Sequence, residues 1–374
     1  MMNNFLEIFM RIGIDVKHLR KNSAGIKVYL ENLLDALQKL DSENTYFLFS
    51  PSPISYKLKN ENFNLVVTPS KLPGILWQQY ELPHYVKDYK IDVFWGPEQT
   101  IFLKKLSGVK KVLTVHDFAY RRYPKTMKRS VRTITEHYGS RSILRSDALV
   151  CVSDFTAKEL SHFFSGIAKE KIHVIDNGIV ASIEKEPEAK EDFLLFTGSL
   201  EPRKNLKTLL RALEILKEKG YSPKLKIAGP AGWKNKSFRA ALENSSIRES
   251  VEILGFLSKE KLEHLYATTK AFVFPSLYEG FGLPVLEALN AKTRVFTSEN
   301  SPMQEILGTL GIYFSPESEY SLAESLEKLY QNSSLSFYTE KELEKRREIL
   351  EKYSWENTAK KMLSVFESCA RPKS

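Results

Sequence analysis

The chain has 374 residues. Single hydrophobic cores stop growing at roughly 250 to 300 residues, so two domains are expected. Hydrophobic residues make up 42% of the chain and charged residues 27%, which is ordinary for a soluble globular protein and excludes a disordered or fibrous chain. The net charge is +9, and the two cysteines, Cys151 and Cys369, lack the spacing of a disulfide framework or a thiolate metal site.

Short apolar runs alternate with longer helical patterns along the first half of the chain, which favours a parallel sheet covered by helices. Strands are predicted at residues 10–14, 46–50, 65–68, 93–95, 112–115 and 148–152. Since the first of these reads like the true start of a domain, residues 1–9 are expected to be an extension or a misassigned start.

A charged stretch at residues 183–192 is nearly devoid of apolar side chains and predicts a linker between two domains. The alternation then restarts. Strands are predicted at 193–197, 224–228, 251–254 and 271–275, and helices at 206–219, 339–352 and 355–369, the last with Ser354 as its candidate N-cap. The expected fold class is α/β, with two doubly wound Rossmann-like domains and the functional site in the cleft between them, at the carboxyl ends of their strands.

No apolar run is long enough to span a bilayer and no secretory signal opens the chain, so a cytoplasmic protein is expected.

The positive charge of the chain is concentrated in its first half. Residues 1–180 hold 26 Lys and Arg against 18 Asp and Glu, whereas residues 181–374 hold 29 against 28. The densest basic cluster consists of Arg121, Arg122, Lys125, Lys128, Arg129 and Arg132. It favours an anionic partner such as a lipid headgroup, a phosphorylated acceptor or nucleic acid, and a solvated helix face is an equal alternative.

The most specific motif follows the predicted strand at 271–275. A loop with Gly280 and Gly282 lets a ligand approach the backbone closely, and Pro284 is expected at the first position of a helix. The N–H groups of a helix start attract anions. Glu279 in the loop and Glu287 one turn into the helix bracket this site, and carboxylates suit sugar hydroxyls.

A second loop with the same strand-loop-helix layout follows the strand at 193–197. It begins at Gly198 and carries Arg203 and Lys204 just before a helix. These side chains can neutralise a diphosphate, and as cations at a helix start they would be mildly unfavourable in a purely structural role.

Three further candidates lie in the first half of the chain. His116 follows the strand at 112–115, where a catalytic role and a structural one are equally plausible. Ser153 occupies the equivalent place after the strand at 148–152, and an N-cap explains it as well as a ligand does. Gly25 is a candidate phosphate-loop residue ahead of a helix expected at 28–40.

Several catalytic motifs are absent from the sequence. Among them are G-x-G-x-x-G, the P-loop, H-E-x-x-H and G-x-S-x-G, which argues against a dinucleotide oxidoreductase, a P-loop NTPase, a zinc protease and a nucleophile-elbow hydrolase. No Asp-x-Asp follows a strand, so a metal-bound diphosphate is not required.

Taken together, these motifs resemble a family 4 retaining glycosyltransferase of the GT-B type, closest to the bacterial mannosyltransferase B-like enzymes of O-antigen and polysaccharide assembly. The resemblance covers nearly the whole chain and rests above all on the Glu-x7-Glu motif from Glu279 to Glu287. Supporting segments are residues 115–117, 152–156, 197–206, 227–229 and 253–256. Lys27 departs from the pattern, because that subgroup usually has glycine there.

The resemblance implies a role for each motif. Glu279 is expected near the anomeric centre of the donor sugar, Glu287 at the ribose, and Arg203 and Lys204 at the diphosphate, while His116 meets the sugar from the first domain. The other candidate donor-binding residues are Gly198, Gly280, Phe281, Gly282, Leu283, Gly25 and Ser153.

The implied function is retaining transfer of a sugar, with mannose from GDP-mannose leading, to a glycan or polyprenyl-linked acceptor in cell-surface polysaccharide synthesis. No metal, no further cofactor and no nucleic acid is expected. Residues 10–182 would form the acceptor-side domain, with a helix at 355–370 packed back on it, and residues 183–352 the donor-binding domain. The basic cluster would allow peripheral contact with the inner face of the cell membrane.

Two alternatives to this function stay open. One is a nucleotide-sugar epimerase or phosphorylase of the same fold, because fold alone does not determine function. The other is a non-catalytic basic protein that binds membranes or nucleic acid.

Overall fold

The computed structural model describes residues 9–20, 24–180, 189–299 and 301–370. They form two compact units. Unit 1 holds the described residues of Met1–His116, Thr133–Gly178 and Trp355–Ser374, and unit 2 those of Asp117–Arg132 and Ile179–Ser354. The expected N-terminal extension and most of the expected linker, at residues 1–8 and 183–188, lie outside the described residues.

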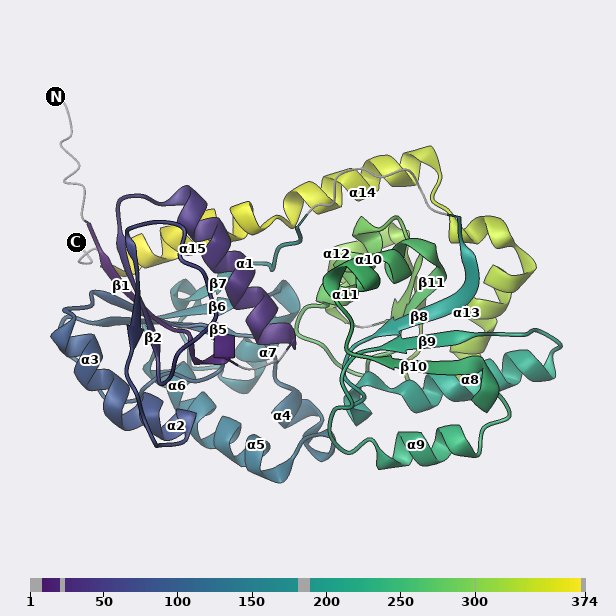
Figure 1. Cartoon of the computed structure of the whole chain (residues 1–374), viewed down its shortest axis with the longest axis horizontal. Helices are drawn as coiled ribbons and strands as arrows, with labels where there is room; N and C mark the ends of the chain where they lie inside the picture. Colours follow the sequence, from purple (N-terminus) through teal and green to yellow (C-terminus); the bar gives the residue numbers. More distant parts are fainter. Residues whose placement is uncertain (1–8, 21–23, 181–188, 300, 371–374) are drawn as a thin grey trace. The chain divides into compact units, whose positions relative to one another are not determined.

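Unit 1 is built on a parallel sheet with the strand order β3-β2-β1-β4-β5-β6-β7 (Figure 1). Its strands are β1 (Arg11–Asp15), β2 (Thr45–Ser50), β3 (Phe63–Val67), β4 (Val93–Gly96), β5 (Lys110–Val115), β6 (Ala148–Cys151) and β7 (Ile172–Val174). The six strands predicted from the sequence are confirmed, and β7 is additional. The chain builds outward from β1 in one direction and then from β4 in the other, so the topological switch point lies between these two strands.

Helices cover the sheet of unit 1. They are α1 (Ala24–Leu40), α2 (Gly74–Leu76), α3 (Leu82–Asp88), α6 (Ser140–Arg145), α7 (Asp154–Phe163) and α15 (Trp355–Ala370), with short turns η1 (Lys17–Arg20) and η5 (Lys169–Lys171) and the π-helical turns η2 (Trp77–Glu81) and η4 (Thr135–Gly139). α1 begins four residues before the expected start, so Gly25 lies in its first turn rather than ahead of it.

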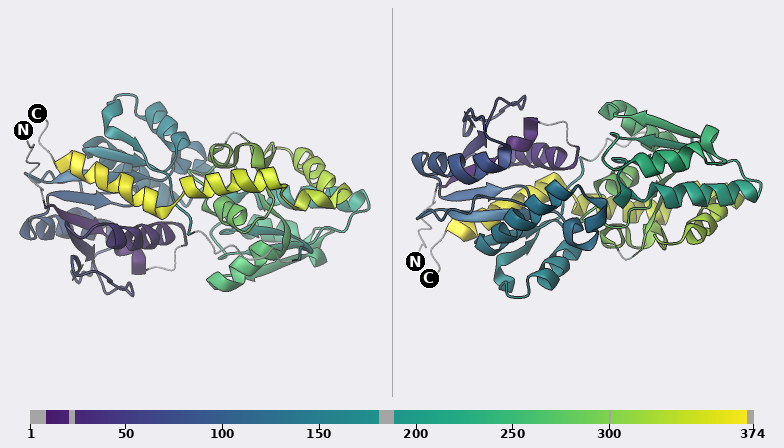
Figure 2. Two further views of the ribbon diagram at one scale, coloured as in Figure 1. Left: turned by 90° about the horizontal axis from the view of Figure 1, so that it is seen from above. Right: turned by 90° about the horizontal axis from the view of Figure 1, so that it is seen from below.

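The last helix, α15, completes the core of unit 1. It lies alongside α1 in both views of Figure 2. Trp355 contacts the ring of Tyr29 edge-on, with centroids 5.9 Å apart, and Phe366 packs against Trp95 at 6.0 Å. All four rings are buried, so α15, although last in the sequence, covers apolar side chains of α1 and β4 and belongs to the hydrophobic core of unit 1.

Unit 2 has a parallel sheet with the order β10-β9-β8-β11-β12-β13, and its switch point lies between β8 and β11. The strands are β8 (Glu191–Thr197), β9 (Leu225–Ala228), β10 (Val251–Gly255), β11 (Thr269–Phe274), β12 (Val295–Ser298) and β13 (Gly311–Phe314). The first four were predicted from the sequence.

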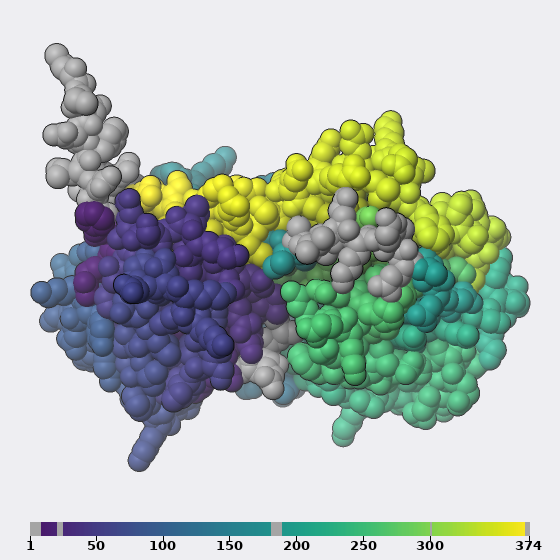
Figure 3. Space-filling model, turned by 45° about the horizontal axis from the view of Figure 1, so that its top comes forward, coloured from purple at the N-terminus to yellow at the C-terminus, as the bar shows by residue number. Residues whose placement is uncertain are grey.

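The helices of unit 2 are α4 (Ala119–Arg122), α8 (Leu206–Glu218), α9 (Lys236–Glu243), α10 (Lys259–Thr268), α11 (Leu283–Asn290), α12 (Pro302–Leu307), α13 (Glu319–Gln331) and α14 (Glu340–Lys352). Short turns are η3 (Pro124–Thr126), η6 (Pro202–Lys204), η7 (Arg248–Ser250), η8 (Gly308–Leu310) and η9 (Ser333–Ser336). A capping box of Thr339 and Glu342 starts α14, whose atoms form part of the outer surface of unit 2 in Figure 3. None of the helices that the structure describes is long and apolar enough to cross a membrane.

The segment Asp117–Arg132 belongs to unit 2, although it lies between elements of unit 1 in the sequence. Trp233 donates its indole N–H to the carbonyl of Thr126 at 2.9 Å, and Lys234 donates to the carbonyl of Lys125 at 2.7 Å. The hydroxyl of Tyr278 accepts the amide of Phe118 at 3.0 Å. These contacts attach the basic cluster to unit 2.

Two glycines bring the loops after β8 and β9 into close contact. Gly229 has a φ of +145°, and a Cβ atom there would lie 2.1 Å from the carbonyl oxygen of Gly198, which has a φ of +139°. The amide of Gly198 in turn donates to the carbonyl of Ala228 at 2.9 Å. Only glycine fits such an approach, and it holds the loop that carries Arg203 and Lys204 in place.

We expect Gly229→Ala to lower the free energy of unfolding by about 3 kcal/mol or more, because backbone strain of about 1–3 kcal/mol adds to a direct clash. Gly220→Ala is the matched control. Gly220 also has a positive φ, +90°, but nothing lies within 4 Å of the added Cβ atom, so it should cost only about 1–2 kcal/mol. Denaturant unfolding measures both; equal losses would contradict the close approach.

Candidate active site at the switch point of unit 2

The two loops singled out in the sequence meet at the switch point of unit 2. One follows β8 and contains Gly198 and η6, and the other follows β11 and contains Glu279 to Gly282. The amide of Leu277 donates to the carbonyl of Arg203 at 2.9 Å and joins them. Ligands of doubly wound sheets bind at the carboxyl ends of the strands at such a point.

Glu279 bridges the two cations of the other loop. Its Oε1 accepts from Lys204 Nζ at 2.7 Å and its Oε2 from Arg203 Nη1 at 2.9 Å. Arg203 also donates to the carbonyl of Tyr278. Glu279 and Lys204 are buried, and the Lys204 ammonium lies over the ring of Phe274, 5.0 Å from its centroid. The cations and the carboxylate therefore hold one another in fixed positions.

The charges of this group shift its titration. Burial by itself would raise the pKa of the Glu279 carboxyl, but the positive charges of Arg203 and Lys204 outweigh it, and the pKa is lowered to about 2. Burial would likewise lower the pKa of Arg203, but Glu279, Asp117 and Glu201 outweigh it and raise that pKa. Glu279 and Arg203 are thus ionised at neutral pH.

The start of α11 lies directly after Glu279. Gly282 is the N-cap, with a φ of +124°, and a Cβ atom there would lie 3.2 Å from the side chain of Met303. Leu283 is the first helical residue and Pro284 the second, one position later than expected. Pro284 still falls in the first turn, where amides have no carbonyl partner within the helix. The loop backbone of Gly280 and Phe281 leads into this positive helix end.

Glu287 lies one turn into α11, and its Oε2 accepts from the hydroxyl of Tyr266 on α10 at 2.8 Å. The same hydroxyl lies 2.7 Å from Thr197 Oγ1, at the end of β8. Burial raises the pKa of Glu287. Both glutamates of the motif are therefore connected to the carboxyl end of β8, Glu279 through Arg203 and Lys204, and Glu287 through Tyr266.

The remaining candidates lie on unit 1. His116 Nε2 lies 2.7 Å from the carbonyl oxygen of Pro97, and its ring packs edge-on against Tyr29 at 5.0 Å. Ser153 is the N-cap of α7, and its hydroxyl accepts the amide of Thr156 at 3.0 Å. Gly25 is exposed in the first turn of α1. The structure thus brings together the candidates of unit 2 as one group, and these three belong to a different unit.

Three residues of the site received no role of their own from the sequence, although Tyr278 and Asp117 lie within the segments that it marks. The hydroxyl of Tyr266 orients Glu287, and that of Tyr278 joins its loop to Phe118. The negative charge of Asp117 helps to raise the pKa of Arg203. Tyr266 sits in an amphipathic helix and reads as a core residue. Tyr278 could have been found, because it precedes Glu279 in a loop where a large aromatic side chain needs a partner.

The site can bind a polyanion and hydroxyl groups. Arg203 and Lys204 carry five and three N–H donors, more than their contacts with Glu279 and Tyr278 use, so they can take further acceptors. The two carboxylates accept hydroxyl donors. Within the described part of the chain no group of three His, Cys, Asp or Glu side chains is arranged to hold a metal ion.

Two family models match the chain. Residues 181–365 match the model described as glycosyl transferases group 1, and residues 23–182 match the one described as glycosyltransferase family 4. The chain is a glycosyltransferase of these families.

Curated relatives and a solved structure agree with this assignment. The O-antigen chain mannosyltransferase B of Escherichia coli is 27% identical over 312 residues, which cover 78% of this chain and 80% of that protein. The serotype-specific mannosyltransferase WbdA of Escherichia coli is 28% identical over 237 residues, 59% of this chain but only 29% of that longer protein. WaaG, a glycosyltransferase of lipopolysaccharide biosynthesis, superimposes with a TM-score of 0.71 at 16% identity, over 95% of this chain and 99% of WaaG.

The structural likeness confirms the expected fold class. Both sheets are parallel, each unit is doubly wound, and WaaG shares this arrangement over its whole length. This glycosyltransferase has the two Rossmann-like domains of the GT-B fold.

We expect protonation of Glu279 in acid to remove the stabilisation that its ion pairs give to the folded glycosyltransferase. Because the folded-state pKa is lowered, this contribution is fully present above about pH 4.5 and is lost as the pH falls toward about 2, with a size of up to about 3 kcal/mol. The stability difference between wild type and Glu279→Gln, measured by denaturant unfolding, should therefore shrink between pH 6 and pH 3. Glu252→Gln, on an exposed position of β10, is the control. A constant difference for Glu279→Gln would contradict the ion-pair account.

Proposed function

We propose that the chain is a retaining glycosyltransferase that moves mannose from GDP-mannose to a glycan or polyprenyl-linked acceptor in cell-surface polysaccharide synthesis. The observation that carries this proposal is the group of Arg203, Lys204 and Glu279 beside the start of α11, which offers donors for a diphosphate and a carboxylate for a sugar. Mannose is chosen because two curated relatives are named mannosyltransferases.

The proposed roles follow from the chemistry of each group. Arg203 and Lys204 bind the diphosphate, together with backbone N–H groups from Gly280 to Leu283 and around Gly198. Glu279 lies by the anomeric centre of the sugar, and Glu287, oriented by Tyr266, accepts hydrogen bonds from the ribose. Gly25, Ser153 and His116 of unit 1 are assigned to the donor, with His116 at its sugar.

In the proposed reaction the bond between the sugar C1 and the diphosphate oxygen breaks, and its electron pair stays on that oxygen. The acceptor oxygen forms the new bond to C1 on the same face, and its proton goes to the leaving oxygen. Stabilising the negative charge of the departing diphosphate is then the main task of the protein, and Arg203 and Lys204 perform it.

An epimerase or phosphorylase remains the second enzyme hypothesis from the sequence. The membership in the glycosyltransferase families and the pairing of the Glu-x7-Glu motif with two cations support transfer instead.

We expect Arg203→Ala and Glu279→Ala each to lower the turnover of the donor by at least about two orders of magnitude, because each removes a charge contact made in the transition state. Release of GDP from GDP-mannose, with and without acceptor, measures this turnover. Arg211→Ala, which removes an exposed arginine paired with Glu214 on α8, is the control and should keep wild-type turnover.

A panel of nucleotide sugars tests the identity of the donor in the same preparation. The donor should raise the melting temperature, since a ligand at 100 times its dissociation constant adds about 2.7 kcal/mol to stability. Stabilisation by a UDP-sugar but not by GDP-mannose would replace the proposed donor, and full turnover in both alanine variants would refute the site.

The basic cluster supports a further proposal, peripheral contact with an anionic membrane. Arg122, Lys125, Lys128, Arg129 and Arg132 are exposed, and Arg121 is half-buried. α5 (Arg129–Ile134) buries none of its residues, and its Val131 is 43% exposed. Cations beside an exposed apolar side chain suit the surface of a bilayer.

We expect charge reversal at Arg121, Arg122 and Arg129 to abolish sedimentation with vesicles that contain phosphatidylglycerol, and salt to weaken wild-type binding. Reversal of three exposed lysines elsewhere, Lys71, Lys87 and Lys105, is the control for net charge. Binding that ignores both salt and the first reversal would disprove the membrane contact.

A further inference from the structure

Three consecutive residues of the loop after β11 hold Arg203 in place. The amide of Leu277 donates to the carbonyl of Arg203 at 2.9 Å. The carbonyl of Tyr278 accepts from Arg203 Nη1, and the carboxylate of Glu279 accepts from the same nitrogen at 2.9 Å. The loop therefore holds both the backbone and the guanidinium of the arginine, so a shift of the loop would move the guanidinium with it.

Tyr278 also contacts the segment Asp117–Arg132, which lies far from it in the sequence. Its hydroxyl accepts the amide of Phe118 at 3.0 Å, across 160 residues of the chain. Its ring lies 5.9 Å from that of Tyr123, centroid to centroid. Tyr278 and Phe118 are buried, with 5% and 0% of their surface exposed. A hydrogen bond in such surroundings is stronger than one at the surface, so it restricts the position of Tyr278.

The segment on the other side of this hydrogen bond is fixed at two places. Asp117 Oδ1 accepts the amide of Ala119 at 2.9 Å, which stabilises the turn around the amide of Phe118. Farther along the segment, Trp233 donates its indole N–H to the carbonyl of Thr126 at 2.9 Å. The hydroxyl of the tyrosine therefore has a partner whose position is determined by the rest of unit 2.

The same segment also acts on the charge of the arginine. Burial alone would lower the pKa of Arg203, but the negative charge of Glu279, and after it that of Asp117, raises this pKa. Asp117 directly precedes Phe118, so a displacement of the Phe118 amide would displace this charge as well. A hydrogen bond and a charge from one segment thus act on the same guanidinium.

We propose that Tyr278 is a positioning residue of the transfer reaction, which ties the loop that holds Arg203 to the segment Asp117–Arg132 and keeps the guanidinium beside the departing diphosphate. This inference rests on the proposed function for its link to turnover. A donor that faces a developing charge lowers the barrier most when it is in place before the bond breaks, because it then needs no reorganisation. A purely structural hydroxyl would contribute to folding alone.

The test is Tyr278→Phe, which removes the hydroxyl and keeps the ring and the carbonyl. We expect it to lower the turnover of GDP-mannose about tenfold, equivalent to about 1.4 kcal/mol of activation free energy. In an Arg203→Ala background the same change should lower turnover by less than about twofold, because the group through which it acts is gone. Release of GDP measures the wild type, both single variants and the double variant.

Tyr338→Phe is the matched control. The hydroxyl of Tyr338 donates to the carbonyl of Thr293 at 3.0 Å, just before β12 and thus at the amino end of the sheet, away from the site. Turnover should stay within about twofold of wild type, because distant sites do not couple. Thermal melting shows that all variants fold. If Tyr278→Phe lowers turnover equally with and without Arg203, or no more than Tyr338→Phe does, the positioning role is overturned and the proposed function stands.

Binding of inorganic pyrophosphate separates the inference from the proposed function. If GDP-mannose is not turned over, the proposed function fails, and calorimetric titration of the full chain with pyrophosphate then decides on the role of Tyr278. Tyr278→Phe should raise the dissociation constant about fivefold in the presence of Arg203 and leave it unchanged in Arg203→Ala, since the guanidinium makes the contact. An unchanged constant in Tyr278→Phe alone, or no binding to the wild type, would contradict the inference.

Discussion

The bridge from Glu279 to Arg203 and Lys204 is the interaction on which unit 2's site depends. It joins the loops after β8 and β11, the two strands at the switch point. Taking one partner from a buried ion pair leaves an uncompensated charge, which typically costs about 3–5 kcal/mol. The same loop carries Tyr278, whose carbonyl accepts from Arg203 and whose hydroxyl accepts from Phe118. One carboxylate thus holds both the loop before α11 and, through Tyr278, the segment at 117–132.

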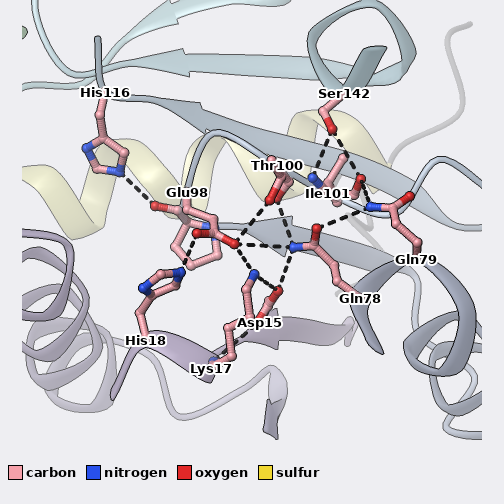
Figure 4. Close-up of polar contacts among 11 residues, drawn as sticks. Asp15, Lys17, His18, Gln78, Gln79, Glu98, Thr100, Ile101, His116 and Ser142 are labelled. Carbon is pink, nitrogen blue, oxygen red and sulfur yellow. Dashed lines mark hydrogen bonds and ion pairs between the residues drawn. The ribbon is translucent and has the colours of Figure 1, made fainter. Parts of the chain in front are cut away.

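The two units use opposite electrostatics on the same topology. At the switch point of unit 2 the carboxylate of Glu279 bridges two cations, Arg203 and Lys204. At that of unit 1 the ammonium of Lys17 lies between two carboxylates, Asp15 and Glu98 (Figure 4). The side chains at the strand ends therefore differ in charge between the two units, although both sheets are doubly wound.

The sequence predicts the strands well where apolar residues run without interruption. β8 and β11 are such runs, and all ten predicted strands, six in unit 1 and four in unit 2, are confirmed. The sequence does not predict β7, β12 and β13. β7 and β13 are short and only partly buried, and two of the four residues of β12, Thr297 and Ser298, are polar. The segment at 117–132 follows unit 1 in sequence but contacts Trp233 and Tyr278, and such long-range partners leave no local pattern.

The site shows the same limit. The Glu-x7-Glu spacing and the loop with Arg203 and Lys204 could be found because each is a short motif beside a strand. Tyr266 could not, because a tyrosine in an amphipathic helix looks like core until its hydroxyl is seen on Glu287. The side chains that meet at Glu98 in unit 1, Asp15, Lys17 and Gln78, come from separate segments of the chain, and such long-range contacts leave no local pattern.

The position of α15 at the end of the chain affects the order in which the two units can fold during synthesis. A ribosome makes the strands of unit 1 first and α15 only after every element of unit 2, yet Trp355 and Phe366 fill the apolar face beside Tyr29 and Trp95. Until α15 is synthesised, the apolar surface of unit 1 around Tyr29 and Trp95 therefore lacks the helix that covers it. All elements of unit 2 are synthesised before α15. Unit 1 is therefore begun first, but its hydrophobic core is completed last.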